Sequence, residues 1–126
     1  MPISIQIDHE ARTVRATASG SLSAADLRRH LEELVAGGVI AYARVVDCRS
    51  ASVNLIPEDI PHFVAFIRQL RERFGKTRTA YVSSSDVLYG MMRMYGMMNE
   101  QHDPGFAVFR TLEEAEAWIG LDTTES

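Results

Sequence analysis

The chain has 126 residues, of which 46% are hydrophobic and 24% are charged, and this composition is typical of one globular domain rather than a disordered, collagen-like or coiled-coil chain. A chain of this length can bury one hydrophobic core without disulfide or metal support, and it has no room for a second domain. The 13 Lys and Arg residues against 17 Asp and Glu residues give a net charge of −4, which disfavours nucleic acid as a partner.

The cysteine content and the amino-terminal sequence bear on the compartment. Cys48 is the single cysteine, so no disulfide within the chain is expected. The first residues, MPISIQIDHE, lack the cationic and long apolar stretches of a secretory signal. No segment reaches the roughly 18 continuous apolar residues of a membrane span. We therefore expect a cytoplasmic protein without a transmembrane segment.

The first predicted elements are a β-hairpin and a helix. Isoleucines in residues 3–7 alternate with polar residues, and residues 13–18 resume the alternation after a polar break, which is the pattern of two paired strands. Ser23 can cap the next helix, with Asp26 following at the spacing of a capping box. The helix is predicted over residues 24–36, because leucines recur at helical spacing and two glycines follow.

The remaining predicted elements alternate between strands and helices. Short apolar runs indicate buried strands, and apolar stripes at helical spacing indicate amphipathic helices. In chain order they are a strand over 41–48, a loop over 49–56, a helix over 57–74, a strand over 79–83, a helix over 87–101, a strand over 106–109 and a final helix that opens with a capping box of Thr111 and Glu114. We expect residues 1–121 to form a single domain and residues 122–126 to be a frayed tail.

This order of elements, β-β-α-β-α-β-α-β-α, predicts the fold class. A hairpin pairs its strands antiparallel, whereas strands separated by a helix pair in parallel through crossovers. We therefore predict an α/β domain with a mixed, mostly parallel sheet of four or five strands. Its antiparallel edge lies near the amino terminus, and helices cover its faces.

Three short runs, taken with this order, resemble the STAS domain (sulfate transporter and anti-sigma-factor antagonist) and, within it, the SpoIIAA-like proteins. The runs are Gly20-Ser21-Leu22-Ser23 before the first helix, Val45-Val46-Asp47 in the central strand, and residues 109–119 (FRTLEEAEAWI) near the end. The resemblance covers nearly the whole chain and implies the STAS fold. In the anti-sigma-factor antagonists of this family, a serine at the start of the second helix is phosphorylated by a partner kinase.

The segment that matches this phosphoacceptor site departs from the family pattern. Residues 53–59 (VNLIPED) carry no hydroxyl group, so the phosphorylation switch does not carry over. Asp47 matches the family's aspartate at the end of the central strand, while Ser50 and Ser52 lie earlier in the loop. A binding role for the same surface remains open.

Polar side chains gather after the predicted strands, where open α/β sheets bind their ligands. The candidate ligand-binding residues are Asp47, Arg49, Ser50, Ser83, Ser84, Ser85 and Arg110. Serine hydroxyls beside the free N–H groups of a helix start, together with the charge of Arg49, are suited to a phosphate or carboxylate. The alternative is that the serines only cap the helix and that Arg49 pairs with Asp47.

The sequence carries no catalytic or metal-binding pattern. Cys48 can act as a nucleophile or redox sensor only with a lowered pKa and a nearby base, and the alternative is a buried core residue. The four histidines lie apart without metal-ligand spacing. Neither a glycine-rich phosphate loop nor a nucleophile elbow occurs. We therefore expect no metal, no cofactor and no enzyme activity.

Residues 68–78 (RQLRERFGKTR) form a basic patch on an acidic chain. Such a patch is typical of a site for anionic lipid or an acidic partner. The alternative is a solvated helix end whose positive charges complement the helix dipole.

Methionines concentrate in the predicted helix over 87–101. It contains the near-repeat Tyr-Gly-Met-Met at 89–92 and 95–98, and at this spacing equivalent positions face different directions, so the apolar surface wraps around the helix. Thioethers suit an adaptable contact surface, and the two glycines favour close approach to the backbone. The candidate residues for an interface or a hydrophobic ligand are Met91, Met94, Met97, Met98 and Phe66. The alternative is a methionine-rich core helix.

The leading hypothesis is a non-catalytic binding or regulatory module that acts through protein–protein contact, as a homodimer or with another protein. The alternative is a carrier or sensor of a hydrophobic or amphipathic anionic small molecule, seated beside the methionine-rich helix with its anionic head near Arg49 and the three serines. A hydrolase or thiol enzyme that uses Cys48 or Ser84 is the third hypothesis.

Overall fold

The computed structural model of the chain describes residues 3–54, 56–75, 77–90, 93 and 106–124. Its elements are β1 (Ile3–Asp8), β2 (Thr13–Ser23), α1 (Ala24–Ala36), β3 (Ala43–Asn54), α2 (Asp59–Phe74), β4 (Thr79–Val82), β5 (Phe106–Phe109) and α4 (Leu112–Thr124). Residues 86–90 are also helical. The predicted order of strands and helices is therefore confirmed within the described residues.

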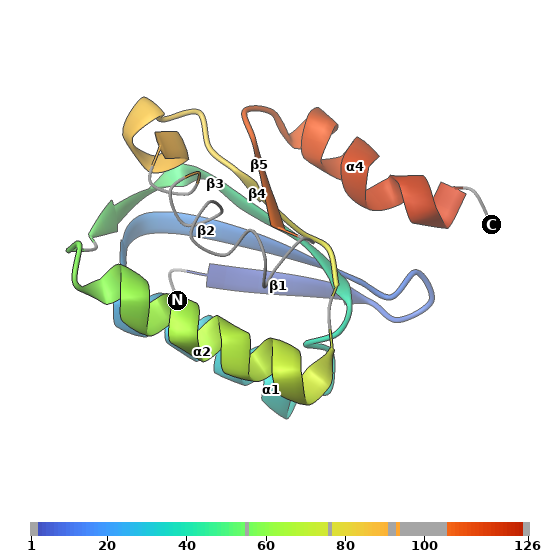
Figure 1. Cartoon of the computed structure of the whole chain (residues 1–126). Helices are drawn as coiled ribbons and strands as arrows, with labels where there is room; N and C mark the ends of the chain where they lie inside the picture. Colours follow the sequence, from blue (N-terminus) through green and yellow to red (C-terminus); the bar gives the residue numbers. More distant parts are fainter. Residues whose placement is uncertain (1–2, 55, 76, 91–92, 94–105, 125–126) are drawn as a thin grey trace.

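The strands form one five-stranded sheet in the order β1-β2-β3-β4-β5. The β1–β2 hairpin is antiparallel, and β2–β3, β3–β4 and β4–β5 are parallel. This arrangement confirms the predicted mixed sheet with its antiparallel edge near the amino terminus. The central strand is β3, so residues that follow β3, β4 and β5 share one end of the sheet (Figure 1).

The strand β3 is longer than predicted, and this corrects the expected loop over 49–56. After an irregularity in the pairing, Ser19 of β2 lies opposite Ser50 of β3, and the ladder continues to Ser23 and Asn54. These segments hold few of the β-branched and aromatic residues that favour strands. Pairing with the extended β2 satisfies their backbone groups and makes them strands.

The helix boundaries follow local chemistry. Ser23 and Asp26 form the predicted capping box of α1. The helix α2 begins at Asp59 rather than at residue 57, because the Asp59 carboxylate accepts a hydrogen bond from the Ile56 N–H and holds residues 57–58 in a turn. The helix α4 runs through Thr124, three residues into the segment 122–126 that we expected to fray.

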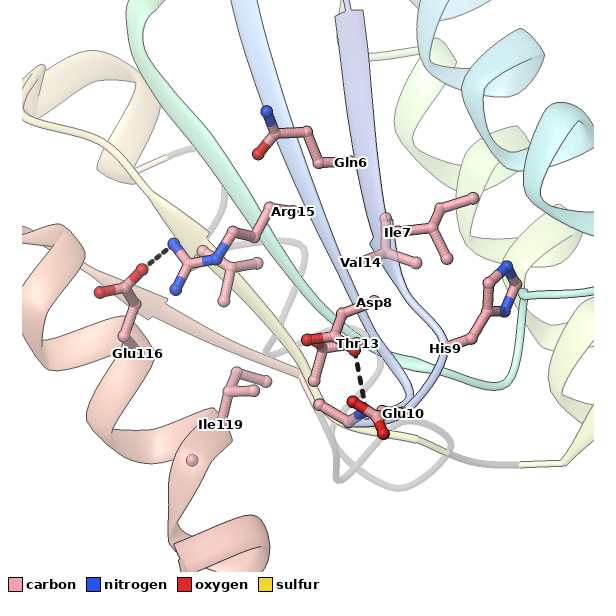
Figure 2. A pocket seen from close by; sticks show the side chains of 13 residues that line it. Gln6, Ile7, Asp8, His9, Glu10, Thr13, Val14, Arg15, Glu116 and Ile119 are labelled. Carbon is pink, nitrogen blue, oxygen red and sulfur yellow. Dashed lines mark hydrogen bonds and ion pairs between the residues drawn. The ribbon is translucent and has the colours of Figure 1, made fainter.

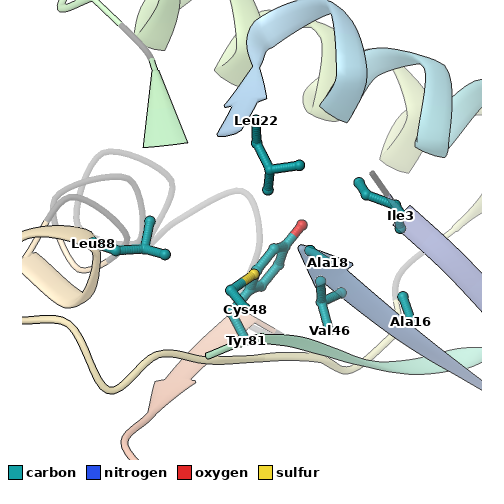
Figure 3. Packing of buried hydrophobic residues seen from close by; sticks show 8 residues of the cluster. All are labelled: Ile3, Ala16, Ala18, Leu22, Val46, Cys48, Tyr81 and Leu88. Carbon is teal, nitrogen blue, oxygen red and sulfur yellow. The ribbon is translucent and has the colours of Figure 1, made fainter. Parts of the chain in front are cut away.

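The helices cover the sheet unequally (Figure 1). Both α1 and α2 lie on one face, which we call the α1–α2 face, and α4 lies on the other, the α4 face. Strand alternation divides the core accordingly. Two clusters pack on the α1–α2 face, one around Val14, Leu31 and Leu34 and the other around Leu22, Cys48 and Tyr81 (Figure 3), and a third joins α4 to β3 and β4. Among the described residues no helix is long and apolar enough to span a membrane.

Candidate functional site

Ser83, Ser84, Ser85 and Arg110 lie just beyond the ends of β4 and β5, whereas Asp47, Arg49 and Ser50 lie within β3, which continues to Asn54. Asp47 of β3 lies opposite Val82 of β4, and Val82 lies opposite Phe109 of β5. Ser83 and Arg110 therefore follow at the same level of neighbouring strands. The structure brings these parts of the chain to one end, as the sequence predicted.

Asp47 and Arg49 form a closed ion pair. The Arg49 Nε and Nη2 groups donate to the two carboxylate oxygens of Asp47 at 2.9 and 2.8 Å, and the Arg49 backbone N–H donates at 3.1 Å. The side-chain hydrogen bond from Arg49 lowers the pKa of Asp47 below its ordinary value. The pairing alternative is therefore the one that the structure shows, and the charge of Arg49 is balanced within the chain.

Ser85 caps the helical segment 86–90, and Ser83 holds the turn before it. The Ser83 hydroxyl accepts from the Ser85 N–H at 3.2 Å, and the Ser85 hydroxyl accepts from the Leu88 N–H at 3.3 Å. Ser83 is fully buried, so its hydroxyl is not open to a ligand. The helix-capping alternative accounts for Ser85, and the hydroxyl of Ser83 is used in the preceding turn. Ser84 is exposed, and its carbonyl oxygen contacts Arg110.

Arg110 connects the end of β5 to the helical segment 86–90. Its Nη1 lies 2.8 Å from the Asp86 carboxylate and 3.5 Å from the Ser84 carbonyl oxygen. Its guanidinium carbon lies 4.0 Å from the centroid of the Tyr89 ring. Among the contacts of the described residues, none joins this group to the Asp47–Arg49 pair or to Ser50, which lies exposed on β3. The seven candidates thus share one end of the sheet without forming one coordinated site.

Cys48 lies inside the core. Its side chain is 1% exposed and packs beside Tyr81 and Leu22 (Figure 3). Burial, with a smaller contribution from the charge of Asp47, raises the pKa of the thiol to about 12. A thiol with this pKa is protonated at neutral pH and is a poor nucleophile. The prediction of a buried core cysteine is therefore confirmed.

Two buried polar residues were not singled out from the sequence. Burial and the charge of Arg44 lower the pKa of His30 to about 3, so this histidine is neutral at physiological pH. Arg44 is 6% exposed. Strand alternation contained the signal for it, because Arg44, Val46 and Cys48 must point to the same face of β3.

The interface candidates divide between described and undescribed residues. Met91, Met94, Met97 and Met98 lie outside the described residues, so the methionine surface stays a prediction. Phe66 is half-buried and packs with the α1–α2 core, and the Arg28 guanidinium carbon lies 4.2 Å from its ring centroid. Gly90 does not have a close neighbour in the chain, since a Cβ atom built on it meets nothing within 4 Å among the described residues.

The basic segment makes contacts within the chain. The Arg71 Nη2 group donates to the Thr79 hydroxyl at 3.3 Å, and the Arg78 Nη1 group donates to the Trp118 carbonyl oxygen at 2.9 Å. The Arg73 guanidinium carbon lies 5.2 Å from the centroid of the Phe74 ring. These contacts favour a helix end over a site for lipid or an acidic partner, but Arg71 and Arg78 are half-buried and not solvated as the alternative expected.

A groove of about 740 Å³ lies at the other end of the sheet, between the β1–β2 hairpin and α4 (Figure 2). An ion pair between Arg15 and Glu116 crosses it, and Gln6 and Ile119 line its walls. None of the candidate site residues lines this groove. The only sequence signal for it is the polar side of the alternation in β1, which indicates a face that remains solvated.

No group of His, Cys, Asp or Glu residues with the geometry of a metal site occurs in the part of the chain that the structure describes. The segment before α2 also lacks the serine that is the phosphoacceptor in the STAS family's anti-sigma-factor antagonists. The described residues before α2 are Asn54, Ile56, Pro57 and Glu58, and none carries a hydroxyl.

No protein-family model and no curated protein sequence matches the chain. Solved structures match nearly its full length. An uncharacterized protein from the DUF3478 family with a SpoIIAA-like fold, from Shewanella loihica PV-4, has a TM-score of 0.60 at 16% identity and covers 93% of both chains. The chain has a SpoIIAA-like fold.

Two further structures share the SpoIIAA-like fold. The anti-sigma factor antagonist SpoIIAA in its unphosphorylated form matches with a TM-score of 0.57 at 14% identity over 98% of both chains. An anti-sigma factor antagonist from Mycobacterium paratuberculosis matches with a TM-score of 0.60 at 16% identity over 93% of both chains. At these identities the likeness shows the fold, and the residues of the site must be argued on their own chemistry.

Proposed function

We propose that this chain is a non-catalytic binding module that acts through contact with another protein. The observation that carries the proposal is the exposure of two apolar side chains that follow β3 and β4 at the carboxyl end of the sheet. Val87, at the start of the helical segment 86–90, is 74% exposed, and Ile56, before α2, is 56% exposed. Exposed apolar side chains that gather inside a rim of polar residues are typical of a protein-binding surface.

The polar groups at this end support binding rather than catalysis. Arg49 and Arg110 are each paired with a carboxylate, and Ser83 is buried in the turn before the helical segment 86–90. A catalytic group needs a reactive protonation state and an open path to substrate. A preformed, internally neutralised surface loses little side-chain entropy when it docks against a partner.

The solved relatives support the same class of function. Two of them are described as anti-sigma factor antagonists, which names a protein as their target. The proposal takes from them only the idea of a protein partner. It leaves out control by phosphorylation, because the residues before α2 carry no hydroxyl.

The sequence also suggests a second copy of this chain as the partner, in contact through the methionine-rich helix and Phe66. Light scattering at micromolar concentration tests it, with twice the chain mass of 14.1 kDa expected for a homodimer. A single species at the chain mass would reject the homodimer. It would leave the contact with another protein to be tested separately.

Residence in the cytoplasm likewise stays a prediction of the sequence.

Site-specific photo-crosslinking tests the protein-binding surface. A photoreactive phenylalanine analogue at Val87 or Ile56 is expected to give the same adduct in cells of the source organism. The matched controls carry the analogue at Glu32 of α1 and Glu10 of the β1–β2 turn, both exposed and outside the proposed surface. The proposal is wrong if Val87 and Ile56 give no adduct or only the adducts that the control positions give.

A substitution then measures the surface with the purified adduct partner. Val87→Asp places a charge in a desolvated contact, so we expect the dissociation constant to rise at least tenfold, or about 1.4 kcal/mol. Because Val87 is exposed, the variant should unfold at nearly the wild-type temperature. An unchanged dissociation constant would exclude Val87 from the contact.

A further inference from the structure

Arg44 is a cation inside the hydrophobic core. It lies on the central strand β3, between Val14 of β2 and Thr79 of β4, with its side chain on the α1–α2 face. The residue is 6% exposed, and Thr79 beside it is 2% exposed. Burial of an arginine at this depth removes most of its hydration, which must be replaced by other contacts.

The contacts that the chain supplies are incomplete. The Arg44 Nη2 group donates to the Tyr81 hydroxyl at 3.2 Å, and the guanidinium carbon lies 5.9 Å from the Tyr81 ring centroid. The Arg44 Nε group is buried and has no hydrogen-bond partner among the described residues. Within the described part of the chain, no carboxylate forms an ion pair with Arg44. The buried guanidinium therefore lacks both an anion and one acceptor.

Arg44 lines a cavity of about 20 Å³. Arg44, Arg71, Thr79 and Tyr42 supply its polar wall, and Leu31 and Ile67 supply apolar wall. Arg71 donates to the Thr79 hydroxyl at 3.3 Å, which holds a second guanidinium at the cavity. A volume of this size suits one particle of about the size of a water molecule, so the candidate occupants are a water molecule and a monatomic ion.

The charges around the cavity favour an anion over a neutral occupant. Both charged groups that line the cavity are cationic. His30, the other titratable group that acts on Arg44 from α1, is neutral because burial and the charge of Arg44 lower its pKa to about 3. In a site of low dielectric constant, an anion between two guanidinium groups gains more than a water molecule does.

We propose that this cavity binds a single monatomic anion of the halide class, with chloride as the physiological form, held by the guanidinium groups of Arg44 and Arg71. The anion supplies the acceptor that Arg44 Nε lacks and neutralises buried charge in the core. It is therefore a structural ligand of the α1–α2 face. The site lies at the opposite end of β3 and β4 from the proposed protein-binding surface, because Arg44 and Thr79 open the β3–β4 pairing.

Thermal unfolding at constant ionic strength tests the site. Sodium chloride is replaced stepwise by sodium gluconate, whose anion is too large for the cavity. A ligand that binds only the native state stabilises it by mass action. The wild-type Tm should therefore rise by about 4 °C when chloride reaches ten times its dissociation constant. Over the whole series the Tm should follow the concentration dependence of a single binding site. Arg44→Met removes the buried charge with little change of volume, and the chloride dependence should vanish. Arg15→Met, on the exposed groove, should keep it.

A crystal grown in sodium bromide keeps the proposal testable if Arg44→Met does not fold. We expect an anomalous bromide peak in the cavity, within hydrogen-bonding distance of Arg44 Nε. A water molecule at that position, an equal chloride dependence in Arg44→Met and wild type, or a wild-type Tm that does not respond to chloride would each overturn the proposal.

Discussion

His30 and Arg44 have ionisable side chains that this fold buries beside apolar neighbours. They alter the stability of the protein in different ways, because a histidine can release its proton whereas an arginine keeps it. Burial makes the neutral form of His30 the native form. The resulting pH dependence can be measured without any knowledge of the protein's partner.

The free energy of unfolding should fall as the pH drops from 6.5 toward 3. In this window the unfolded chain binds a proton at His30, whereas the native chain, with a pKa of about 3 against an ordinary value of 6.5, does not. Stability is therefore complete above pH 6.5 and is lost on acidification. Between pH 6 and pH 4 the wild type should lose roughly 2 kcal/mol more than His30→Leu in urea unfolding.

A matched variant isolates this effect from the general acid sensitivity of the carboxylates. His62 is exposed on α2, so His62→Leu should follow the wild-type pH profile. Parallel profiles for wild type and His30→Leu would show that His30 accepts a proton in the native state and would contradict the assigned burial.

At the scale of elements, some glycines occupy a backbone conformation that only glycine adopts easily, and others do not. Gly75 ends α2 with φ +89° and ψ −178°, a region that residues with a Cβ atom rarely adopt. Gly90 lies in the helical segment 86–90, and a Cβ atom there meets nothing within 4 Å. The two positions therefore predict opposite responses to alanine.

Gly75→Ala should destabilise the protein by about 1–3 kcal/mol through backbone strain, and Gly90→Ala should stabilise it by up to about 1 kcal/mol through helix propensity. Chemical denaturation of the two variants beside wild type measures both. A destabilised Gly90→Ala would mean that the backbone at this position is packed more closely than the described residues indicate.

Elements also show where prediction from the sequence succeeded. The α1 boundaries followed from Ser23, Asp26 and the leucine spacing, all of which act within one helix. The end of β3 did not, because residues 49–54 become strand only through pairing with β2. Such pairing lies outside the reach of local propensity.

At the scale of the molecule, the residues that pack in the core differ from those in the proposed binding surface. Leu34 is 1% exposed in the α1–α2 core, whereas Val87 is 74% exposed. Leu34→Ala should cost about 2–5 kcal/mol of stability because it removes buried surface and leaves a cavity. Val87→Ala should change stability by no more than about 0.5 kcal/mol.

Urea unfolding followed by one probe on the α1–α2 face and one on the α4 face checks this prediction. It also tests whether the domain unfolds in one cooperative transition. Both probes should report the same transition, since the sheet is shared by the two faces. A Val87→Ala variant that loses as much stability as Leu34→Ala would show that Val87 is part of the core, and it would remove the main support for the protein-binding surface.

The sequence by itself determined the order of elements, the mixed sheet and the end of the sheet at which Asp47, the serines and Arg110 lie. These features depend on periodicity, caps and the crossover rule, which act over short stretches of chain. Only the tertiary structure decided that Arg49 and Arg110 form ion pairs with carboxylates of the same chain and that Ser83 is buried. It also decided that Arg44 faces a cavity under α1 and α2, because side chains from four separate elements meet there. Contacts between distant segments set the charge and burial of a residue, and the sequence order alone does not contain them.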